Sequence, residues 1–264
     1  MLETTVLNET VILQSHRYSP SGMEPVELAV SAEYLVSFLL NGRPYMTVAC
    51  SGTDLEYLAV GHLVSEGIIL SRKEVARVEI DEGTMTVNVV TVPESDVISR
   101  LVRVRTLVSG CAGSGGAECG EPLERGAVAI DPEVILASVK EFLGLSKNYR
   151  STHGVHSAAL YDTRGALRAF YDEIGRHNAV DKLLGRASAD GIDPGGVMLL
   201  STGRISSEIV TKAAVARIPA IVTRAAPTSL AVELSRRMNI ILVTGVKRDS
   251  FFVHHGADDI RPRG

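Results

Sequence analysis

The sequence contains little cysteine and few aromatic residues for a chain of 264 residues. It has three cysteines, no tryptophan and 5% aromatic residues in total. Three cysteines are too few, and odd in number, for the disulfide framework of a secreted protein, so a cytoplasmic location is expected. No run approaches the roughly 20 apolar residues of a membrane-spanning helix. The N-terminal residues lack a basic region and a small-residue cleavage site, so no secretory signal is expected.

An excess of positive charge is also missing. Lys and Arg together number 27 against 31 Asp and Glu, which gives a formal net charge of −4. A nucleic-acid partner is therefore not expected, and an anionic ligand would need a local cluster of cations. Hydrophobic residues make up 45% of the chain, which predicts a packed globular core. The length suits one large domain or two small ones.

The first half of the chain has the pattern of an α+β fold. Asn41 and Gly42 separate two strand-like runs and tolerate the positive φ of a tight hairpin turn. The segment 53–56 has the residues of a capping box, and the helical period that follows is closed by Gly67. The expected elements are strands at 35–40, 43–49, 75–80 and 85–92, and a helix between 55 and 66.

The second half alternates apolar strands with amphipathic helices. Such alternation predicts parallel strands covered by helices on both faces. The pattern changes near residues 121–127, which predicts an N-terminal domain at 1–125 and a larger α/β domain at 126–264. Strands at 157–161 and 166–171 are expected to form a hairpin about residues 162–165. The other expected elements are strands at 197–201, 220–223 and 240–244, and helices at 132–143, 179–187, 206–217 and 228–238.

Cys111 is the first candidate for chemistry. It lies in the segment 108–120, which has five glycines, also contains Cys119, and shows neither helical nor strand periodicity, so a mobile loop is expected. Arg100, Arg103 and Arg105 come shortly before it, and nearby cations favour the nucleophilic thiolate. A loop cysteine without a role is the alternative. The two cysteines lack a third and fourth ligand at suitable spacing, so no zinc site is expected.

Other polar residues admit structural roles. Cys50 ends an apolar strand, which favours core packing. His153 and His156 qualify as metal ligands by residue type, but no acidic partner stands at a telling spacing, which favours a structural role. The polar run 172–182 around a helix start is either a solvated helix terminus or a polar cluster at the mouth of a pocket.

Two segments follow buried strands of the predicted parallel sheet. Ligands of such sheets bind at the carboxyl ends of the strands, where helix N-termini attract anions. Arg204 and Lys212 would add charge at the first segment, and Lys247 and Arg248 at the second, which predicts a shared anion site. The candidate binding residues are Arg204, Ser206, Ser207, Gly245, Val246, Lys247, Arg248, Asp249 and Ser250.

Five sequence motifs, in this order, resemble the FdhD family of accessory sulfurtransferases required for formate dehydrogenase activity, and the resemblance covers nearly the whole chain. They are the segments TDLEYLAVGHLVSEGII (53–69), THGVHSAALYD (152–162), EIGRHNAVDKLLG (173–185), STGRISSEIVTKA (201–213) and APTSLAVEL (226–234).

The resemblance implies a two-step reaction. A cysteine desulfurase would leave a persulfide on a loop cysteine, and the sulfur would pass to the bis-molybdopterin guanine dinucleotide cofactor, with molybdenum or tungsten, of formate dehydrogenase. The family's Cys-x-x-Cys loop places Cys111 at the first cysteine and Ser114 at the second, while Cys119 stands five residues further on as an auxiliary candidate. The family's cofactor-contacting stretch maps, with a partial match, to 245–250.

The resemblance also implies a fold. The C-terminal domain is expected to be a three-layer, cytidine-deaminase-like α/β domain with a mostly parallel sheet, next to a smaller N-terminal α+β domain. The His-x-Glu and Pro-Cys-x-x-Cys elements of zinc deaminases are absent, so neither zinc nor deamination is expected. A homodimer is expected. The alternative to a sulfurtransferase is a non-catalytic chaperone that binds the cofactor.

Overall fold

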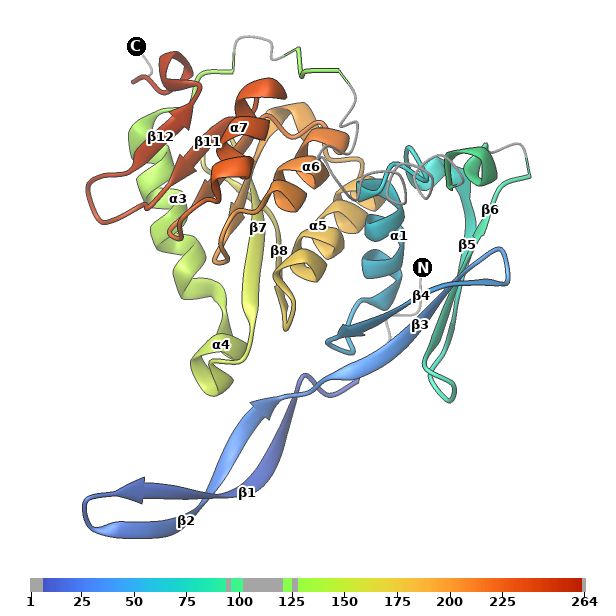
Figure 1. Cartoon of the computed structure of the whole chain (residues 1–264), viewed down its shortest axis with the longest axis vertical. Helices are drawn as coiled ribbons and strands as arrows, with labels where there is room; N and C mark the ends of the chain where they lie inside the picture. Colours follow the sequence, from blue (N-terminus) through green and yellow to red (C-terminus); the bar gives the residue numbers. More distant parts are fainter. Residues whose placement is uncertain (1–6, 94–95, 102–120, 125–127, 263–264) are drawn as a thin grey trace.

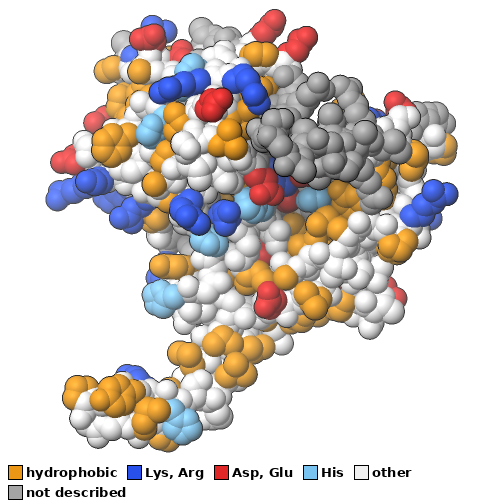
Figure 2. Space-filling model, viewed as in Figure 1, with side chains coloured by type: hydrophobic (Ala, Val, Ile, Leu, Met, Phe, Trp, Pro, Cys, Tyr) orange, Lys and Arg blue, Asp and Glu red, His pale blue; other side chains and the backbone are white. Residues whose placement is uncertain are grey.

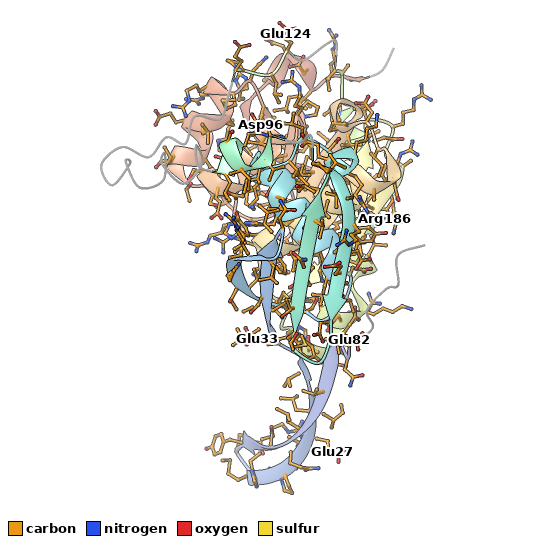
Figure 3. The ribbon with its side chains drawn as sticks, turned by 90° about the vertical axis from the view of Figure 1, so that its right-hand side faces the viewer. Glu27, Glu33, Glu82, Asp96, Glu124 and Arg186 are labelled. Carbon is orange, nitrogen blue, oxygen red and sulfur yellow. The ribbon has the colours of Figure 1, made fainter. Side chains whose placement is uncertain are left out.

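The computed structural model describes residues 7–93, 96–101, 121–124 and 128–262. It contains three sheets, one of them a long arm that projects from the body of the molecule (Figure 1). The arm is an antiparallel pair of strands, β1 (Thr10–Ser19) and β2 (Gly22–Ser31). These strands were not expected from the sequence pattern. Figure 3 shows Glu27 on the arm, far from Glu33 and Glu82 at the lower end of the body.

In the first half, a four-stranded sheet packs on the helix α1. The strand order is β4-β3-β6-β5, and apolar residues of the sheet and of α1 share one buried core. Asn41 and Gly42 have φ of 53° and 74°, as the hairpin prediction requires. The elements are β3 (Tyr34–Leu40), β4 (Arg43–Cys50), α1 (Leu55–Ser65), β5 (Val75–Asp81) and β6 (Thr86–Thr91), with a 3₁₀ turn at Arg72–Glu74.

The second half is built on a six-stranded sheet with the order β12-β11-β10-β9-β7-β8. The strands are β7 (His156–Asp162), β8 (Leu167–Glu173), β9 (Val197–Ser201), β10 (Ala220–Thr223), β11 (Ile241–Thr244) and β12 (Phe252–His255). The helices are α3 (Pro132–Leu145), α4 (Lys147–Thr152), α5 (Arg176–Asp190), α6 (Ser207–Val215) and α7 (Ser229–Arg237), with 3₁₀ turns at Pro194–Gly196 and Ala257–Asp259.

The helices cover both faces of this sheet, which gives three layers (Figure 1). One face packs on α5, α6 and α7 through Leu160, Leu199 and Leu242. The other face packs on α3 through the neighbouring residues Tyr161 and Leu200. Successive residues of one strand thus point into different cores, which is why these strands are apolar throughout.

The prediction of a mostly parallel sheet is wrong. In the described sheet, β9, β10 and β11 are parallel, but the pairs β7–β8, β7–β9 and β11–β12 are antiparallel. The physical reason is the short connections, since β7–β8 and β11–β12 are hairpins that have no crossover helix. The division into domains 1–125 and 126–264 stays a prediction.

Helices α1 and α5 come from different halves of the chain, and their backbones pass very close to each other. A Cβ atom on Gly61 would lie 1.7 Å from the carbonyl oxygen of Asp181, and one on Gly185 would lie 2.0 Å from that of Tyr57. Only glycine permits such an approach of two helix backbones. In the described parts of the chain, no helix is both long and apolar enough to span a membrane.

The capping box expected before α1 is not formed. Asp54 is the N-cap with φ of 51° and makes no side-chain capping hydrogen bond. The hydroxyl of Thr53 instead lies 3.5 Å from the Nζ atom of Lys182 on α5. The local pattern correctly predicts the start of the helix, but the Thr53 side chain contacts α5 and does not cap α1.

Candidate functional site

Cations follow each of the three parallel strands. Arg204 follows β9, Arg224 follows β10, and Lys247 and Arg248 follow β11; all four are exposed. None of their side chains has a hydrogen bond or ion pair to another described residue. Figure 2 shows Lys and Arg side chains gathered over the end of the sheet where the β11–β12 loop lies. This edge therefore offers uncompensated positive charge on a chain whose net charge is negative.

A pocket of about 580 Å³ lies between the β11–β12 loop and α3. We call it the Lys247 pocket. Its wall includes Val246, Lys247 and Arg248 from the predicted stretch 245–250, together with Arg224 and Lys140. Glu133 is the one carboxylate among its described lining residues. The predicted stretch thus lies on a cation-rich cavity.

The rest of the stretch forms the turn beside this pocket. Gly245 has φ of 61° and packs on Phe252, where a Cβ would meet the ring at 2.9 Å. The backbone N–H of Lys247 donates to the carbonyl oxygen of Ser250 at 2.8 Å. The Ser250 hydroxyl donates to Asp249 at 3.3 Å. Asp249 and Ser250 do not line the pocket, so their predicted role in binding a ligand stays a prediction.

Arg204, Ser206 and Ser207 lie apart from the Lys247 pocket. Ser206 is the N-cap of α6 without a side-chain capping bond, and its hydroxyl is 3.4 Å from Nε2 of His177 on α5. The two predicted segments therefore share one sheet edge, but not one cavity. Arg224, which does line the cavity, was missed, although the rule applied to β9 and β11 also applies to the end of β10.

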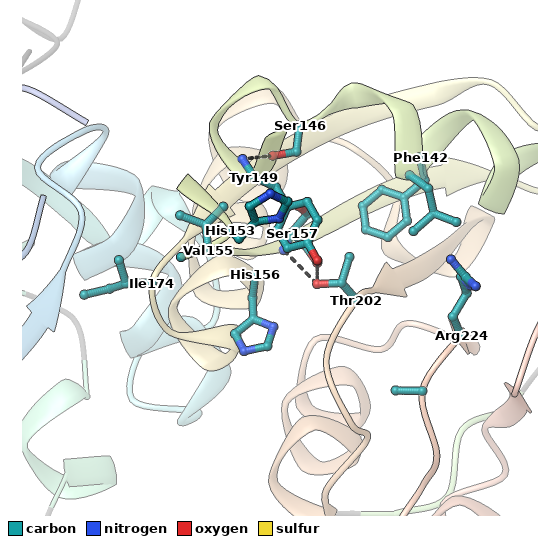
Figure 4. A pocket seen from close by; sticks show the side chains of 13 residues that line it. Phe142, Ser146, Tyr149, His153, Val155, His156, Ser157, Ile174, Thr202 and Arg224 are labelled. Carbon is teal, nitrogen blue, oxygen red and sulfur yellow. Dashed lines mark hydrogen bonds between the residues drawn. The ribbon is translucent and has the colours of Figure 1, made fainter. Parts of the chain in front are cut away.

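A second pocket, of about 690 Å³, adjoins the first (Figure 4). We call it the His156 pocket. The two pockets share Leu143 and Arg224 on their walls. His153 and His156, for which the sequence favours a structural role, both line this cavity, and that role stays a prediction. Their short spacing does not indicate the cavity, because its other walls come from α3, α4 and the residues that follow β8, β9 and β10.

Hydrogen bonds fix one side of the His156 pocket. The hydroxyls of Ser146 and Ser157 donate to the two carboxylate oxygens of Asp172 at 2.7 and 2.6 Å. The backbone N–H of Ser157 donates to Oγ1 of Thr202 at 2.9 Å. Burial, and then the charge of Arg176, lower the pKa of His156, so its imidazole is neutral near pH 7.

Neither expected role describes the polar run 172–182 fully, because several of its polar side chains are buried in ion pairs. Glu173 and Lys182 are fully buried and lie 2.7 Å apart. Ser51 bridges them, since its hydroxyl accepts from Lys182 at 2.7 Å and donates to Glu173 at 2.8 Å. The backbone N–H of Ser51 also donates to Glu173 at 2.9 Å. The end of β4 is thereby tied to β8 and α5.

A second buried ion pair joins α1, α5 and α6. It contains Lys212, so the expectation that Lys212 adds charge to the anion site is wrong. The Nζ atom of Lys212 lies 2.9 Å from Asp181, and the Ser65 hydroxyl donates to the same carboxylate at 2.8 Å. Nδ1 of His62 is 3.1 Å from the other oxygen. Burial by itself opposes ionisation of Asp181, but the Lys212 charge and the hydrogen bonds outweigh it and lower the pKa of this carboxyl to about 2.

This pKa predicts how stability depends on acid. The folded pKa lies below the unfolded value of about 3.9, so the contribution of Asp181 is full above pH ~4 and is lost as the pH falls toward 2. The substitution Asp181→Asn should lower the free energy of unfolding at pH 7 and weaken its pH dependence between pH ~4 and ~2. Urea unfolding across this range measures both, with the exposed Asp258→Asn as control. An unchanged acid dependence in Asp181→Asn would contradict the assignment.

The structure describes only one of the three cysteines. Cys50 is buried, and burial raises the pKa of its thiol to about 12, which confirms a core role. Cys111, Cys119 and Ser114 lie outside the described residues, so their roles stay predictions. Within the described ranges, no group of three or more His, Cys, Asp or Glu is arranged to hold a metal ion.

Comparison with known proteins gives one consistent result. The sulfur carrier protein FdhD of Bacillus subtilis is 32% identical over 258 residues, which cover 96% of this chain and 98% of that protein. The sulfur carrier protein FdhD of Thermoplasma volcanium is 35% identical over 216 residues, or 78% of this chain and 77% of that protein.

A solved structure agrees in fold. A protein from Desulfotalea psychrophila, assigned as a formate dehydrogenase accessory protein, superposes with a TM-score of 0.79 over 96% of this chain and 100% of its own. At 24% identity this likeness bears on the fold alone. The sequence model of the FdhD/NarQ family matches residues 31–261. The chain therefore belongs to the FdhD/NarQ family.

Proposed function

We propose that this protein is a sulfurtransferase that matures formate dehydrogenase. In this proposal Cys111 accepts sulfur from a cysteine desulfurase and passes it to the bis-molybdopterin guanine dinucleotide cofactor. The supporting observation is the family match across residues 31–261, together with relatives of nearly equal length that are named sulfur carriers. A cytoplasmic homodimer is part of the proposal.

The first step is thiol exchange. The Cys111 thiolate attacks the terminal sulfur of the desulfurase persulfide, a new S–S bond forms on Cys111, and the desulfurase cysteine leaves as a thiolate. No net oxidation occurs, since one persulfide is consumed and one is made. The thiol proton of Cys111 must leave first, and the preceding arginines favour that loss.

The cofactor is the substrate of the second step, and the Lys247 pocket supports its binding. A guanine dinucleotide carries a diphosphate, which prefers several cations at fixed positions. Arg224, Lys247 and Arg248 stand on one cavity wall and have no partner among the described residues. Arg204 adds charge at the same edge of the sheet.

The alternative is a chaperone that binds the cofactor without sulfur chemistry. Ser114 favours it, since a serine stands where the family has its second loop cysteine. A chaperone would need the cationic edge and would not need Cys111.

Intact-mass measurement separates the two functions. After incubation with a cysteine desulfurase and cysteine, the protein should gain the mass of one sulfur atom, and a thiol reductant should remove it. The gain should persist in Cys119→Ala and be lost in Cys111→Ala. A protein that gains no sulfur, or that gains it equally in Cys111→Ala, would support the chaperone.

A further inference from the structure

His62 lies at the seam between the two halves and lines neither of the two pockets. The helix α1, which carries it, packs on α5 and on α6 (Figure 1). Nδ1 of His62 lies 3.1 Å from Asp181 on α5, and Nε2 lies 3.3 Å from the hydroxyl of Tyr45 on β4. The His62 side chain is 16% exposed. The imidazole is thus held through both nitrogens, and part of it still meets solvent.

The contacts of Asp181 determine which ring nitrogen of His62 carries the hydrogen. Lys212 and the Ser65 hydroxyl hold the Asp181 carboxylate, which is 3% exposed, in its ionised form. An ionised carboxylate only accepts hydrogen bonds, so in the neutral imidazole the hydrogen lies on Nδ1. Nε2 then keeps its lone pair and accepts from Tyr45. An imidazole oriented in this way by a carboxylate is the arrangement that activates hydroxyl and thiol nucleophiles.

His177, one turn before Asp181 on α5, is arranged differently. Its Nε2 lies 3.4 Å from the Ser206 hydroxyl and 3.3 Å from Glu208, whose side chain is 58% exposed. Burial lowers the pKa of His177, although the charge of Glu208 opposes this. An exposed carboxylate is too mobile and too well hydrated to fix the ring of a base. His62, with its buried carboxylate, is therefore the better-oriented base of the two.

The described residues on either side of the Cys111 segment pack on the two cores that meet at this seam. Leu101, before the segment, packs on the core of the first half, to which α1 belongs. Leu123, after the segment, packs on the core that α5 and α6 share. The elements that hold His62 and Asp181 thus also anchor both ends of the chain that carries the sulfur-accepting thiol. Thiol exchange needs an acceptor for the proton of that thiol.

We propose that His62 is the base that takes the thiol proton when sulfur is accepted, with Asp181 and Lys212 as positioning residues. This inference rests on the proposed function, because that reaction supplies the thiol. The S–H bond of the accepting cysteine breaks, and its proton goes to Nε2 of His62. The thiolate forms a bond to the terminal sulfur of the donor persulfide, and the S–S bond of the donor breaks. The donor cysteine leaves as a thiolate and receives the proton from His62, so protons and electrons balance.

Alkylation measures thiolate formation without a sulfur donor. In a Cys119→Ala background iodoacetamide should add to Cys111, because Cys50 is buried, and intact mass follows the rate. His62→Gln should lower this rate about tenfold at about pH 6.5, as a rise of about one unit in the thiol pKa does. The two rates should converge as the pH rises toward ~9.5, where the thiol ionises without a base. His16→Gln, an exposed histidine on the arm, is the matched control and should alkylate like the background protein.

The rate of sulfur uptake from a cysteine desulfurase and cysteine at neutral pH is the second measurement. His62→Gln should slow it about 100-fold, as the loss of a general base does. Asp181→Asn should slow it as well, because an amide also permits the other tautomer of His62. The double variant should be no slower than His62→Gln, since the two residues act as a unit. Added imidazole should restore part of the rate in His62→Ala and none in Asp181→Asn.

The outcomes separate the base from the proposed function, with urea unfolding to confirm that each variant is folded. If His62→Gln is alkylated and takes up sulfur within about twofold of wild type, His62 is not the base, and the sulfurtransferase stands. If both rates fall but imidazole restores neither in His62→Ala, His62 has a structural role and the proposal is wrong. If wild type takes up no sulfur, the proposed function is wrong, and the pH dependence of alkylation alone decides whether His62 deprotonates the thiol.

Discussion

Replacing Cys111 by alanine should abolish the activation of formate dehydrogenase, whereas replacing Cys119 should leave most of it. Cys111 keeps the family's register in the loop, and Arg105 shortly before it favours the thiolate. Cys119 follows Glu118 and precedes Glu121, whose negative charges oppose thiolate formation. Formate dehydrogenase activity in a host without its own accessory protein measures the effect, which should fall to the level of the empty host for Cys111→Ala.

The matched control is the same assay with Cys50→Ala, a cysteine buried in the core of the first half. It should retain activation if the variant folds. Activity that survives Cys111→Ala but is lost in Cys119→Ala would reverse the assignment of the two loop cysteines. Activity that survives the double replacement would favour the chaperone.

Replacing Lys182 by methionine should cost about 3–5 kcal/mol of unfolding free energy, because it leaves Glu173 as a buried carboxylate without its counter-charge. Both side chains are fully buried, and Ser51 donates to the carboxylate but supplies no charge. Urea unfolding at neutral pH measures the loss. The double variant Lys182→Met with Glu173→Gln should recover part of it, since a neutral amide needs no cation.

Lys73→Met is the matched control, since Lys73 is exposed and surface substitutions usually change stability by less than about 0.5 kcal/mol. A loss under about 1 kcal/mol in Lys182→Met would contradict the inference that the Lys182 charge is needed to keep Glu173 buried. Failure of the double variant to recover stability would assign the loss to packing of the lysine stem instead.

The elements that the sequence predicts well are those whose patterns are local. The strands β9 and β10 have the predicted bounds, because each is an apolar run between two amphipathic helices. The helix α3 begins after Asp131, which caps it by accepting from the N–H of Glu133, as its Asp-Pro start indicates. Periodicity does not report strand direction, so the antiparallel partners of β9 and β11 could not be foreseen.

The arm escaped prediction for a related reason. Its strands have their side chains mostly exposed on both faces, so no alternation between buried and polar positions marks them. The candidate site likewise has a part that local sequence patterns predict and a part that they do not. Lys247 and Arg248 were found because they follow a predictable strand. His156 was discounted because the residues that make its surroundings a pocket, such as Phe142 and Arg224, are distant in sequence.

The close crossing of α1 and α5 has a consequence for how the chain unfolds. Separating the two helices would expose two ion pairs and the facing glycines Gly61 and Gly185, and neither half could bury these groups alone. In a partly unfolded species with only one half intact, these charged side chains would lose the groups that cover them. They would then have to be hydrated, and the remaining half would lose part of its packing. The two halves, although each has its own hydrophobic core, should behave as one cooperative unit and melt in a single calorimetric transition.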